Sequence, residues 1–312
     1  MQVGFTHSHT IAIDIGATKI SLALVSEELH IIKRLEIPSQ TSNDLWAELA
    51  QALGDLCSEE LTSFSPRELR VGIATAGPID LSSGTISPVN ILQWRQFPLV
   101  EQINSLFPGA KISMLGDCTA LALAEHTIGA GVGHKNLLGV VVSTGIGGGL
   151  VINGNVLEGE SGNAALIGHH VIAFNSDRIC VCGRTGCLEE FARGPKMVEA
   201  AKRNGWQGLE DFKSLAQSAS EGDLIAQQAI DDGARALAIG LVNAMMITDV
   251  HTVIIGGGVS FAGDVYWQPL RKHLQVEARF SGFLGEITVL PAKLGSDAGL
   301  IGAAIFAGIQ AG

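Results

Sequence analysis

The stretch Thr10–Val25, TIAIDIGATKISLALV, contains two apolar runs separated by a short turn that carries a glycine. The runs at 10–14 and 20–26, with a third at 31–37, have the spacing of successive hairpins and predict three neighbouring antiparallel strands. Asp14 ends the first run, so a carboxylate stands where the chain enters the turn. The glycine turn therefore joins two strands and not a strand and a helix.

A second stretch, Leu137–Asn153, repeats this arrangement in other letters: LLGVVVS, then TGIGGG, then a returning strand at 149–153. Apolar runs and helical periodicities elsewhere complete two α/β halves. They predict strands at 70–74, 111–115, 252–255 and 287–290, and helices at 44–57, 117–128, 194–203, 221–247 and 297–309. Two α/β lobes whose glycine hairpins face one another form a nucleotide clamp.

The bulk composition narrows the class of protein. The 312 residues are 46% hydrophobic and 16% charged, which suffices for two domains with their own cores. The net charge of −11 repels phosphate backbones and anionic lipid, so we expect no nucleic acid and no membrane as partner. Without an apolar span or a secretory signal pattern, we expect a cytoplasmic protein with reduced cysteines.

Both glycine turns are candidate phosphate-binding loops. The sequence has no Walker A string, and the glycines of the second turn lie between strands, which argues against a dinucleotide-binding fingerprint. In a hairpin, backbone amides without a neighbouring Cβ contact phosphate oxygens directly, and threonine hydroxyls add donors. The candidate nucleotide ligands are Gly16, Thr18, Lys19, Thr144, Gly145 and Gly147, with Gly256, Gly257 and Gly258 for adenine and ribose.

Two of the residues at the first turn have a second interpretation. A carboxylate beside a phosphate site implies an intervening cation, so Asp14 is a candidate ligand of Mg²⁺ through water. The other interpretation of Asp14 is a turn-capping aspartate. Lys19 either adds charge to the phosphate site or is a solvated surface residue.

Asp117 stands between the expected strand at 111–115 and the expected helix at 117–128. One interpretation is a helix N-cap, for which aspartate is a preferred residue. The other is a general base at the carboxyl end of a strand, where α/β folds bind ligands. A hydroxyl that attacks a terminal phosphate needs such a proton acceptor. Both interpretations stay open at this point.

Three of the five cysteines, Cys180, Cys182 and Cys187, lie within eight residues. Their spacing differs from the Cys-x-x-Cys of thioredoxin-type redox motifs. Three thiolates and one imidazole, from His169 or His170, make a closed tetrahedral set, which predicts a structural zinc ion. The two remaining cysteines are interpreted as small apolar side chains: Cys57 and Cys118. A zinc knuckle here would fix the loop that aims Glu189, two residues after the last cysteine.

These motifs resemble the ROK family of sugar kinases and related repressors over essentially the whole chain. DIGATK at 14–19 is similar to the family's phosphate loop DxGGTK, with Ala17 at the second glycine, and STGIGGG at 143–149 is similar to the second loop. IGH…CVCGRTGCLE is similar to the family's zinc signature, and the likeness selects His169 as the zinc ligand. Two more segments match the adenosine side and the C-terminal end of the family: GGGVS at 256–260 and DAGLIGAA at 297–304.

The resemblance implies a two-lobed actin-like (ribonuclease-H-like) α/β ATPase fold with a nucleotide and sugar cleft between the lobes. The smaller lobe is expected at 1–118, joined by the C-terminal helix at 296–312, and the larger lobe with the zinc loop at 119–295. The implied reaction is ATP-dependent phosphorylation of a hexose or N-acylhexosamine at the 6-hydroxyl, with Mg²⁺ and structural Zn²⁺, in a homodimer. By the resemblance Asp117 is the catalytic base, and the sugar ligands are Gly77, Asn90, Asp117, Gly162, His169 and Glu189.

Two positions depart from the family pattern. The family usually has Asn-Asp where this chain has Gly116-Asp117, and AGEIGH where AALIGH places Leu166 at a sugar-binding glutamate. Each lost partner of a buried hydroxyl weakens binding by about 1–3 kcal/mol. Since N-acetylmannosamine kinases of the family tolerate replacement of that glutamate, the resemblance favours an N-acylhexosamine over glucose. Glu160 is either a substitute carboxylate or a solvated loop residue.

A glucokinase-type hexose kinase and a non-catalytic sugar sensor are the alternatives. Repressors of the family carry an additional N-terminal helix-turn-helix, and only about ten residues precede the first expected strand. Asp117 favours an enzyme, since a sensor needs no base.

Overall fold

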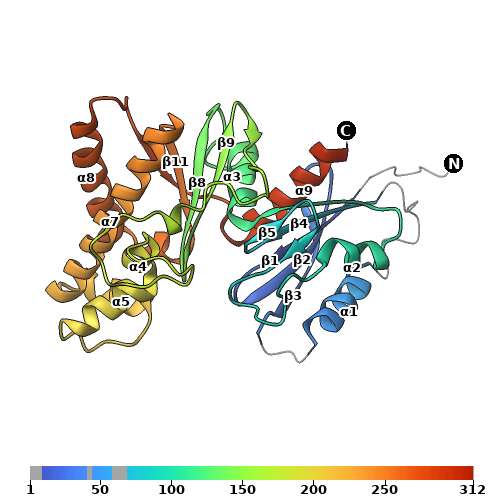
Figure 1. Ribbon diagram of the computed structural model, residues 1–312, viewed down its shortest axis with the longest axis horizontal. Coiled ribbons are helices and arrows are strands. Elements are labelled where there is room, and N and C mark those ends of the chain that lie inside the picture. Colours follow the sequence, from blue (N-terminus) through green and yellow to red (C-terminus); the bar gives the residue numbers. More distant parts are fainter. Residues whose placement is uncertain (1–8, 41–43, 58–68, 312) are drawn as a thin grey trace. The chain divides into compact units, whose positions relative to one another are not determined.

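The computed structural model describes residues 9–40, 44–57 and 69–311, and the chain forms two compact units (Figure 1). The first unit contains the described residues up to Thr127, the segment Val156–Ala164 and the C-terminal part from Ser296. The second contains Ile128–Asn155 and Ala165–Gly295. The first boundary therefore falls after Thr127 and not after residue 118, and the excursion at Val156–Ala164 had no signal in the sequence.

The first unit is built on a five-stranded sheet of order β3-β2-β1-β4-β7. Its strands are β1 (Thr10–Ile15), β2 (Lys19–Val25), β3 (Ile31–Pro38), β4 (Arg70–Thr75) and β7 (Lys111–Gly116). β1, β2 and β3 pair antiparallel, which confirms the predicted meander, whereas β4 and β7 continue the sheet parallel to β1. A small hairpin, β5 (Ile79–Asp80) with β6 (Thr85–Ile86), lies outside this sheet.

Alternation along β1 separates two cores in the first unit. Ile11 and Ile13 pack with the buried leucines of α1 (Leu45–Cys57), and α2 (Leu99–Leu106) joins the same core. Ala12 packs in a second core with α3 (Asp117–Ile128) and α9 (Ala298–Ala311). Small residues on that face admit α9 closely: a Cβ on Gly72 would lie 2.1 Å from the Ala303 carbonyl oxygen.

The second unit has a five-stranded sheet of order β10-β9-β8-β11-β12. The strands are β8 (Leu137–Val142), β9 (Ile146–Ile152), β10 (Asn155–Val156), β11 (Thr252–Gly256) and β12 (Thr288–Pro291). β8 and β9 form the predicted antiparallel hairpin around the second glycine turn, and β11 lies parallel to β8 and β12. Each unit thus has a glycine hairpin whose first strand is a central strand of its sheet.

The helices described in the second unit are α4 (Glu189–Ala192), α5 (Gly194–Arg203), α6 (Phe212–Ser220), α7 (Leu224–Thr248) and α8 (Asp264–Ser281). The 3-10 turns are η2 (Ile167–His169), η3 (Gly258–Ala262) and η4 (Gly295–Asp297), the last of which crosses the sequence boundary of the two units. α5 has the predicted bounds, whereas α4, α6 and α8 were not predicted. α7 begins three residues later than expected, because Asp223 caps it by accepting from the N–H groups of Ile225 and Ala226 at 2.9 Å. Within the described part of the chain, none of the helices is long and apolar enough to cross a membrane.

Candidate functional site

The first glycine turn, residues 16–19, is braced through its carbonyl groups. The Gly16 N–H donates to the Lys19 carbonyl at 3.0 Å, and the Ser39 N–H donates to the Thr18 carbonyl at 3.1 Å. The Gln40 side-chain amide donates to the Ala17 carbonyl at 2.7 Å. The turn between β1 and β2 is therefore held by the residues that follow β3.

Lys19 belongs to an ion network. Its ammonium lies 2.6 Å from Glu36 Oε1, which also accepts from the Arg34 guanidinium at 2.6 Å. Arg34 in turn pairs with Asp297, just before α9. Hydrogen bonds from Lys19 first, and from Arg34, lower the pKa of Glu36. Lys19 is thus paired in this structure, and its contact with phosphate stays a prediction.

Asp14 and Asp117 lie near the carboxyl ends of β1 and β7, which run parallel and so end at the same edge of the sheet. Burial raises the pKa of Asp14 to about 7, the charge of Asp117 adds to this rise, and Lys19 and Arg34 oppose it. Burial also raises the pKa of Asp117. Two mutually repelling carboxyl groups at a strand edge form a site that favours a cation or a proton-transfer role.

The helix-cap interpretation of Asp117 is only partly met. Asp117 is the first residue of α3, and its Oδ1 accepts from the N–H of Cys118 at 2.7 Å. This contact satisfies one N–H of the first helical turn. A carboxylate has capacity for several hydrogen bonds, so capping and proton acceptance are compatible.

The second glycine turn, Ser143-Thr144-Gly145, is held by the segment that joins α4 to α5. The Ser143 N–H donates to the Gly145 carbonyl at 2.9 Å. The Gly194 N–H donates to the Ser143 carbonyl at 3.0 Å, and Arg193 Nη1 donates to the Thr144 carbonyl at 3.1 Å. Arg193 had no signal in the sequence, because Thr144, whose carbonyl it binds, is 49 residues away along the chain. Gly147 is already part of β9, so it lies beyond the turn itself.

The run Gly256–Gly258 ends β11 and begins η3. Gly257 has φ +90°, and a Cβ there would lie 2.4 Å from the Val142 carbonyl oxygen, so only glycine fits. A pocket of about 750 Å³ adjoins this run. Its lining includes Thr144, Phe212, Lys213, Gly258 and Phe261. Its apolar walls with a few charged groups fit a heteroaromatic base with a polar sugar, and the contribution of α6 was not predicted.

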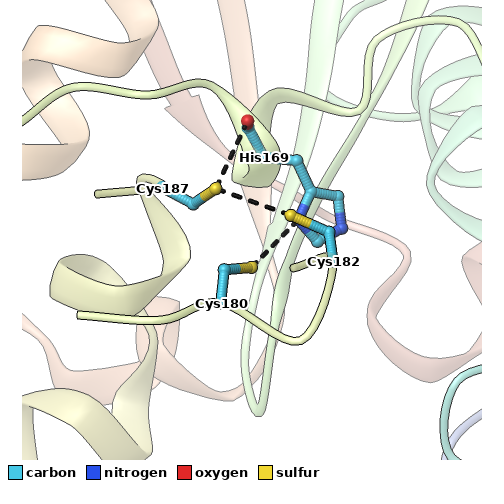
Figure 2. A group of neighbouring side chains, drawn as sticks. All are labelled: His169, Cys180, Cys182 and Cys187. Carbon is cyan, nitrogen blue, oxygen red and sulfur yellow. Dashed lines mark hydrogen bonds between the residues drawn. The ribbon is translucent and has the colours of Figure 1, made fainter. Parts of the chain in front are cut away.

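The cysteines and His169 form one cluster (Figure 2). Their four ligand atoms lie within 4.8 Å of one another. A zinc ion with Zn–S bonds of about 2.3 Å separates two sulfurs by about 3.8 Å in a tetrahedron. Cys182 and Cys187 have their sulfurs 3.7 Å apart, and the Cys180 sulfur lies 3.3 Å from His169 Nδ1. This donor set therefore fits a tetrahedral cation, with His169 and not His170 in the group.

Burial makes two thiols of this cluster less acidic. Burial raises the pKa of Cys180 and of Cys187. Such thiols stay protonated at neutral pH unless a cation stabilises the thiolate. The geometry and the chemistry of the donors thus agree on a metal ligand set.

Glu189 lies between this cluster and the second glycine turn. Its side chain is buried, and its Oε1 accepts from the Cys180 thiol at 3.1 Å and lies 3.6 Å from His169 Nδ1. Its Oε2 lies 3.4 Å from the position that a Cβ on Gly145 would take. One carboxylate therefore lies beside both features that the sequence predicted separately.

The remaining predicted sugar ligands lie in the first unit. Gly162 has φ +92°, and a Cβ there would lie 2.7 Å from Ile79 Cδ1. Asn163 anchors the same segment, because its side chain accepts from the Ile79 N–H at 2.9 Å and donates to the Ile79 carbonyl at 2.6 Å. Gly77 lies close to this pair, with its Cβ position 3.4 Å from Asn163 Oδ1, whereas Asn90 is exposed in a separate turn. Asn163 is a positioning residue that no pattern indicated.

The ROK family model matches residues 10–309. The chain belongs to the ROK family. It is 33% identical to a glucokinase of Thermotoga maritima, with 94% of this chain and 95% of the relative covered, and 35% identical to an N-acetylmannosamine kinase of Escherichia coli, with 96% and 98% covered. A ROK glucokinase of Streptomyces griseus, solved with glucose and AMPPNP, superposes with a TM-score of 0.79 at 29% identity, over 96% of this chain and 98% of that one.

This ROK protein is an ATP-dependent sugar kinase with the two-lobed actin-like ATPase fold. Both positions that depart from the family pattern, Leu166 and Gly116, have room for a larger or more polar side chain. Leu166 is 43% exposed. A Cβ on Gly116 would lie 3.5 Å from Thr119 Oγ1, an ordinary contact. The departures thus remove polar groups without being forced by packing.

Proposed function

We propose that this kinase phosphorylates the 6-hydroxyl of an N-acylhexosamine, with N-acetylmannosamine as the first candidate. The observation that carries the proposal is Leu166, a partly exposed apolar side chain where the family usually has a sugar-binding glutamate. An acyl group offers a methyl surface to such a leucine, whereas a hydroxyl there would lose its acceptor. The 35% identity to an N-acetylmannosamine kinase of Escherichia coli supports the same choice.

In the first unit, we assign the base to Asp117. The raised pKa of this carboxyl group makes it a stronger proton acceptor than an ordinary aspartate once it is ionised. It accepts the proton of the sugar hydroxyl as that oxygen attacks the terminal phosphate. Asp14 is assigned to Mg²⁺ through water, since a cation relieves its repulsion with Asp117. The turn at residues 16–19 supplies amides for phosphate.

In the second unit, we assign Glu189 and His169 to the sugar, with a structural zinc ion held by His169 and the three cysteines. A zinc ion when bound fixes the knuckle, and with it the Glu189 carboxylate that faces the cluster at 3.1 Å. In the first unit, Gly77, Asn90 and Gly162 are assigned to the sugar as well. The turn at Thr144 and the pocket beside Gly258 are assigned to ATP, whose triphosphate and adenosine need amides and an apolar slot respectively.

A glucokinase is the second candidate, supported by the 33% identity to the enzyme of Thermotoga maritima. Glucose has no acyl group to contact Leu166, so this alternative expects weak binding that Leu166→Glu improves. A non-catalytic sensor is the third. We also propose that the protein is cytoplasmic, since ATP and reduced thiols are available in that compartment. A homodimer is proposed from the resemblance to the family.

The deciding experiment is an ADP-release assay with Mg-ATP against glucose, mannose, fructose, allose, N-acetylglucosamine and N-acetylmannosamine. An acylated sugar turned over at least about tenfold better than the others, measured as kcat/KM, supports the proposal. Preference for glucose would replace it with the glucokinase. Sugar binding in calorimetry without turnover of any sugar would favour the sensor.

A further inference from the structure

Arg193 and Gly194 determine which way the peptide groups of the second glycine turn face. Gly194 N–H holds the Ser143 carbonyl at 3.0 Å, and Arg193 Nη1 holds the Thr144 carbonyl at 3.1 Å. In a trans peptide the carbonyl and the following N–H point in opposite directions. The N–H groups of Thr144 and Gly145 therefore point away from this segment. Two successive amides that point the same way form a nest for an anion.

The guanidinium of Arg193 is itself fixed. Its Nη2 lies 3.3 Å from Glu190 Oε1, and the other oxygen of Glu190 lies 3.1 Å from the Lys196 ammonium. Glu190 is 3% exposed, so its charge requires these two cations. One planar fork thus joins a buried carboxylate to the carbonyl of a turn residue, which a point-charge ammonium cannot do with the same geometry.

The space around the turn depends on the same segment. A Cβ on Gly194 would lie 3.4 Å from the Ser143 carbonyl oxygen and 3.2 Å from Phe212 Cβ, so the chain passes the turn closely. Phe212 lines the pocket beside the turn. Arg193 contacts the turn through the Thr144 carbonyl and is not part of the pocket lining.

We propose that Arg193 is a positioning residue for phosphoryl transfer, which holds the Thr144 peptide so that the amides of the second glycine turn face the phosphates of ATP. This inference rests on the proposed assignment of that turn to ATP. It predicts a loss that depends on the phosphates of the nucleotide and not on its adenosine.

The test measures the binding of adenosine, ADP and AMPPNP to the full chain by calorimetry, in wild type, Arg193→Met and Arg193→Lys. We expect Arg193→Met to bind adenosine within about twofold of wild type, and ADP and AMPPNP about tenfold more weakly. Arg193→Lys keeps the charge beside Glu190 and should fall in between. Lys196→Met is the matched control, because it removes the other cation of Glu190 without touching Thr144, and should leave the phosphate dependence unchanged.

Turnover gives an independent readout. In Arg193→Met, kcat should fall by about tenfold or more, while KM for the sugar changes by less than about twofold. Equal weakening of all three nucleotides, or unchanged binding of ADP and AMPPNP in both Arg193 variants, overturns the proposal. If Arg193→Met does not fold, the Arg193→Lys series decides it alone. If wild type turns over no sugar, the proposed function fails, but the nucleotide series still decides the role of Arg193.

Discussion

At the scale of single residues, the roles proposed for the two carboxyl groups of the first unit, Asp117 and Asp14, can be tested separately. Asp117→Asn keeps the shape of the side chain and can still accept from the Cys118 N–H, but it cannot take a proton. We expect kcat to fall by about 10²–10⁴-fold, the usual contribution of a general base, with ATP affinity within about twofold of wild type. Steady-state kinetics and calorimetry measure the two effects. A variant with near-normal kcat would remove the base from Asp117.

The raised pKa of Asp14 leads to a prediction about how the stability of the chain depends on pH. Its pKa rises from 3.8 to about 7 in the folded chain, so its ionisation costs folding free energy, and the cost grows as the pH rises through this window. Asp14→Asn has no such cost. The variant should therefore gain on the order of 1–3 kcal/mol relative to wild type at about pH 8, and little at about pH 4.

Denaturant titrations of both chains without Mg²⁺, at several pH values, measure this difference. Saturating Mg-ATP should narrow the gap, because a cation beside Asp14 stabilises its charged form. A stability difference that does not vary with pH would show that the carboxyl group ionises normally in the folded chain.

At the scale of elements, α9 offers a matched pair of glycines. A Cβ on Gly299 would lie 2.3 Å from Asp14 Oδ2, whereas on Gly308 the nearest atom is Arg70 Nη1 at 4.0 Å. Gly299→Ala should destabilise the chain by about 1–3 kcal/mol and reduce turnover, since either the buried Asp14 carboxyl group or the start of α9 must shift. Gly308→Ala should be neutral or stabilise by up to about 1 kcal/mol. Thermal unfolding of both variants tests this, and equal effects would contradict the close approach.

The elements also show how far the sequence could be followed. Strands such as β1 and β8 were predictable, because an unbroken apolar run bounded by glycine is a local signal. α8 was not, since Pro269 lies inside it and its composition is polar. Burial of Tyr266, Trp267 and Leu270 in the core of the second unit holds this helix in spite of the proline. Packing of that kind has no local pattern.

The residues of the candidate site also differ in how far the sequence predicts them. The cysteine cluster was predictable from spacing, but spacing alone did not choose between His169 and His170. The family resemblance selected His169, and the structure places that residue, in the turn η2, within the cluster. Arg193 and Asn163 were not predictable, because each binds a distant backbone group. Arg193 binds a carbonyl 49 residues away, and Asn163 binds a peptide group 84 residues away. Contacts to a distant backbone leave no motif.

At the scale of the whole molecule, each unit has its own hydrophobic packing, and the cluster of His169 and three cysteines belongs to the second. Metal removal should therefore destabilise the second unit more than the first. A chelator strong enough to extract zinc should lower the protection of β8 and β9 in hydrogen exchange, because the turn that carries His169 packs closely against β9: a Cβ on Gly168 would lie 2.0 Å from the Ile146 carbonyl oxygen. The strands β1 and β4 should keep their protection.

The same experiment can be given a control within the cluster. Cys187→Ser removes a buried ligand and should reproduce the chelated state, with an unfolding midpoint lower by on the order of 5–10 °C and no further response to chelator. Cys57 is partly buried against the core of the first unit, so Cys57→Ser should keep the chelator response of wild type. Uniform loss of protection in both units would mean that the metal supports the fold of the whole chain, and an unchanged exchange pattern would mean that the cluster holds no structural ion.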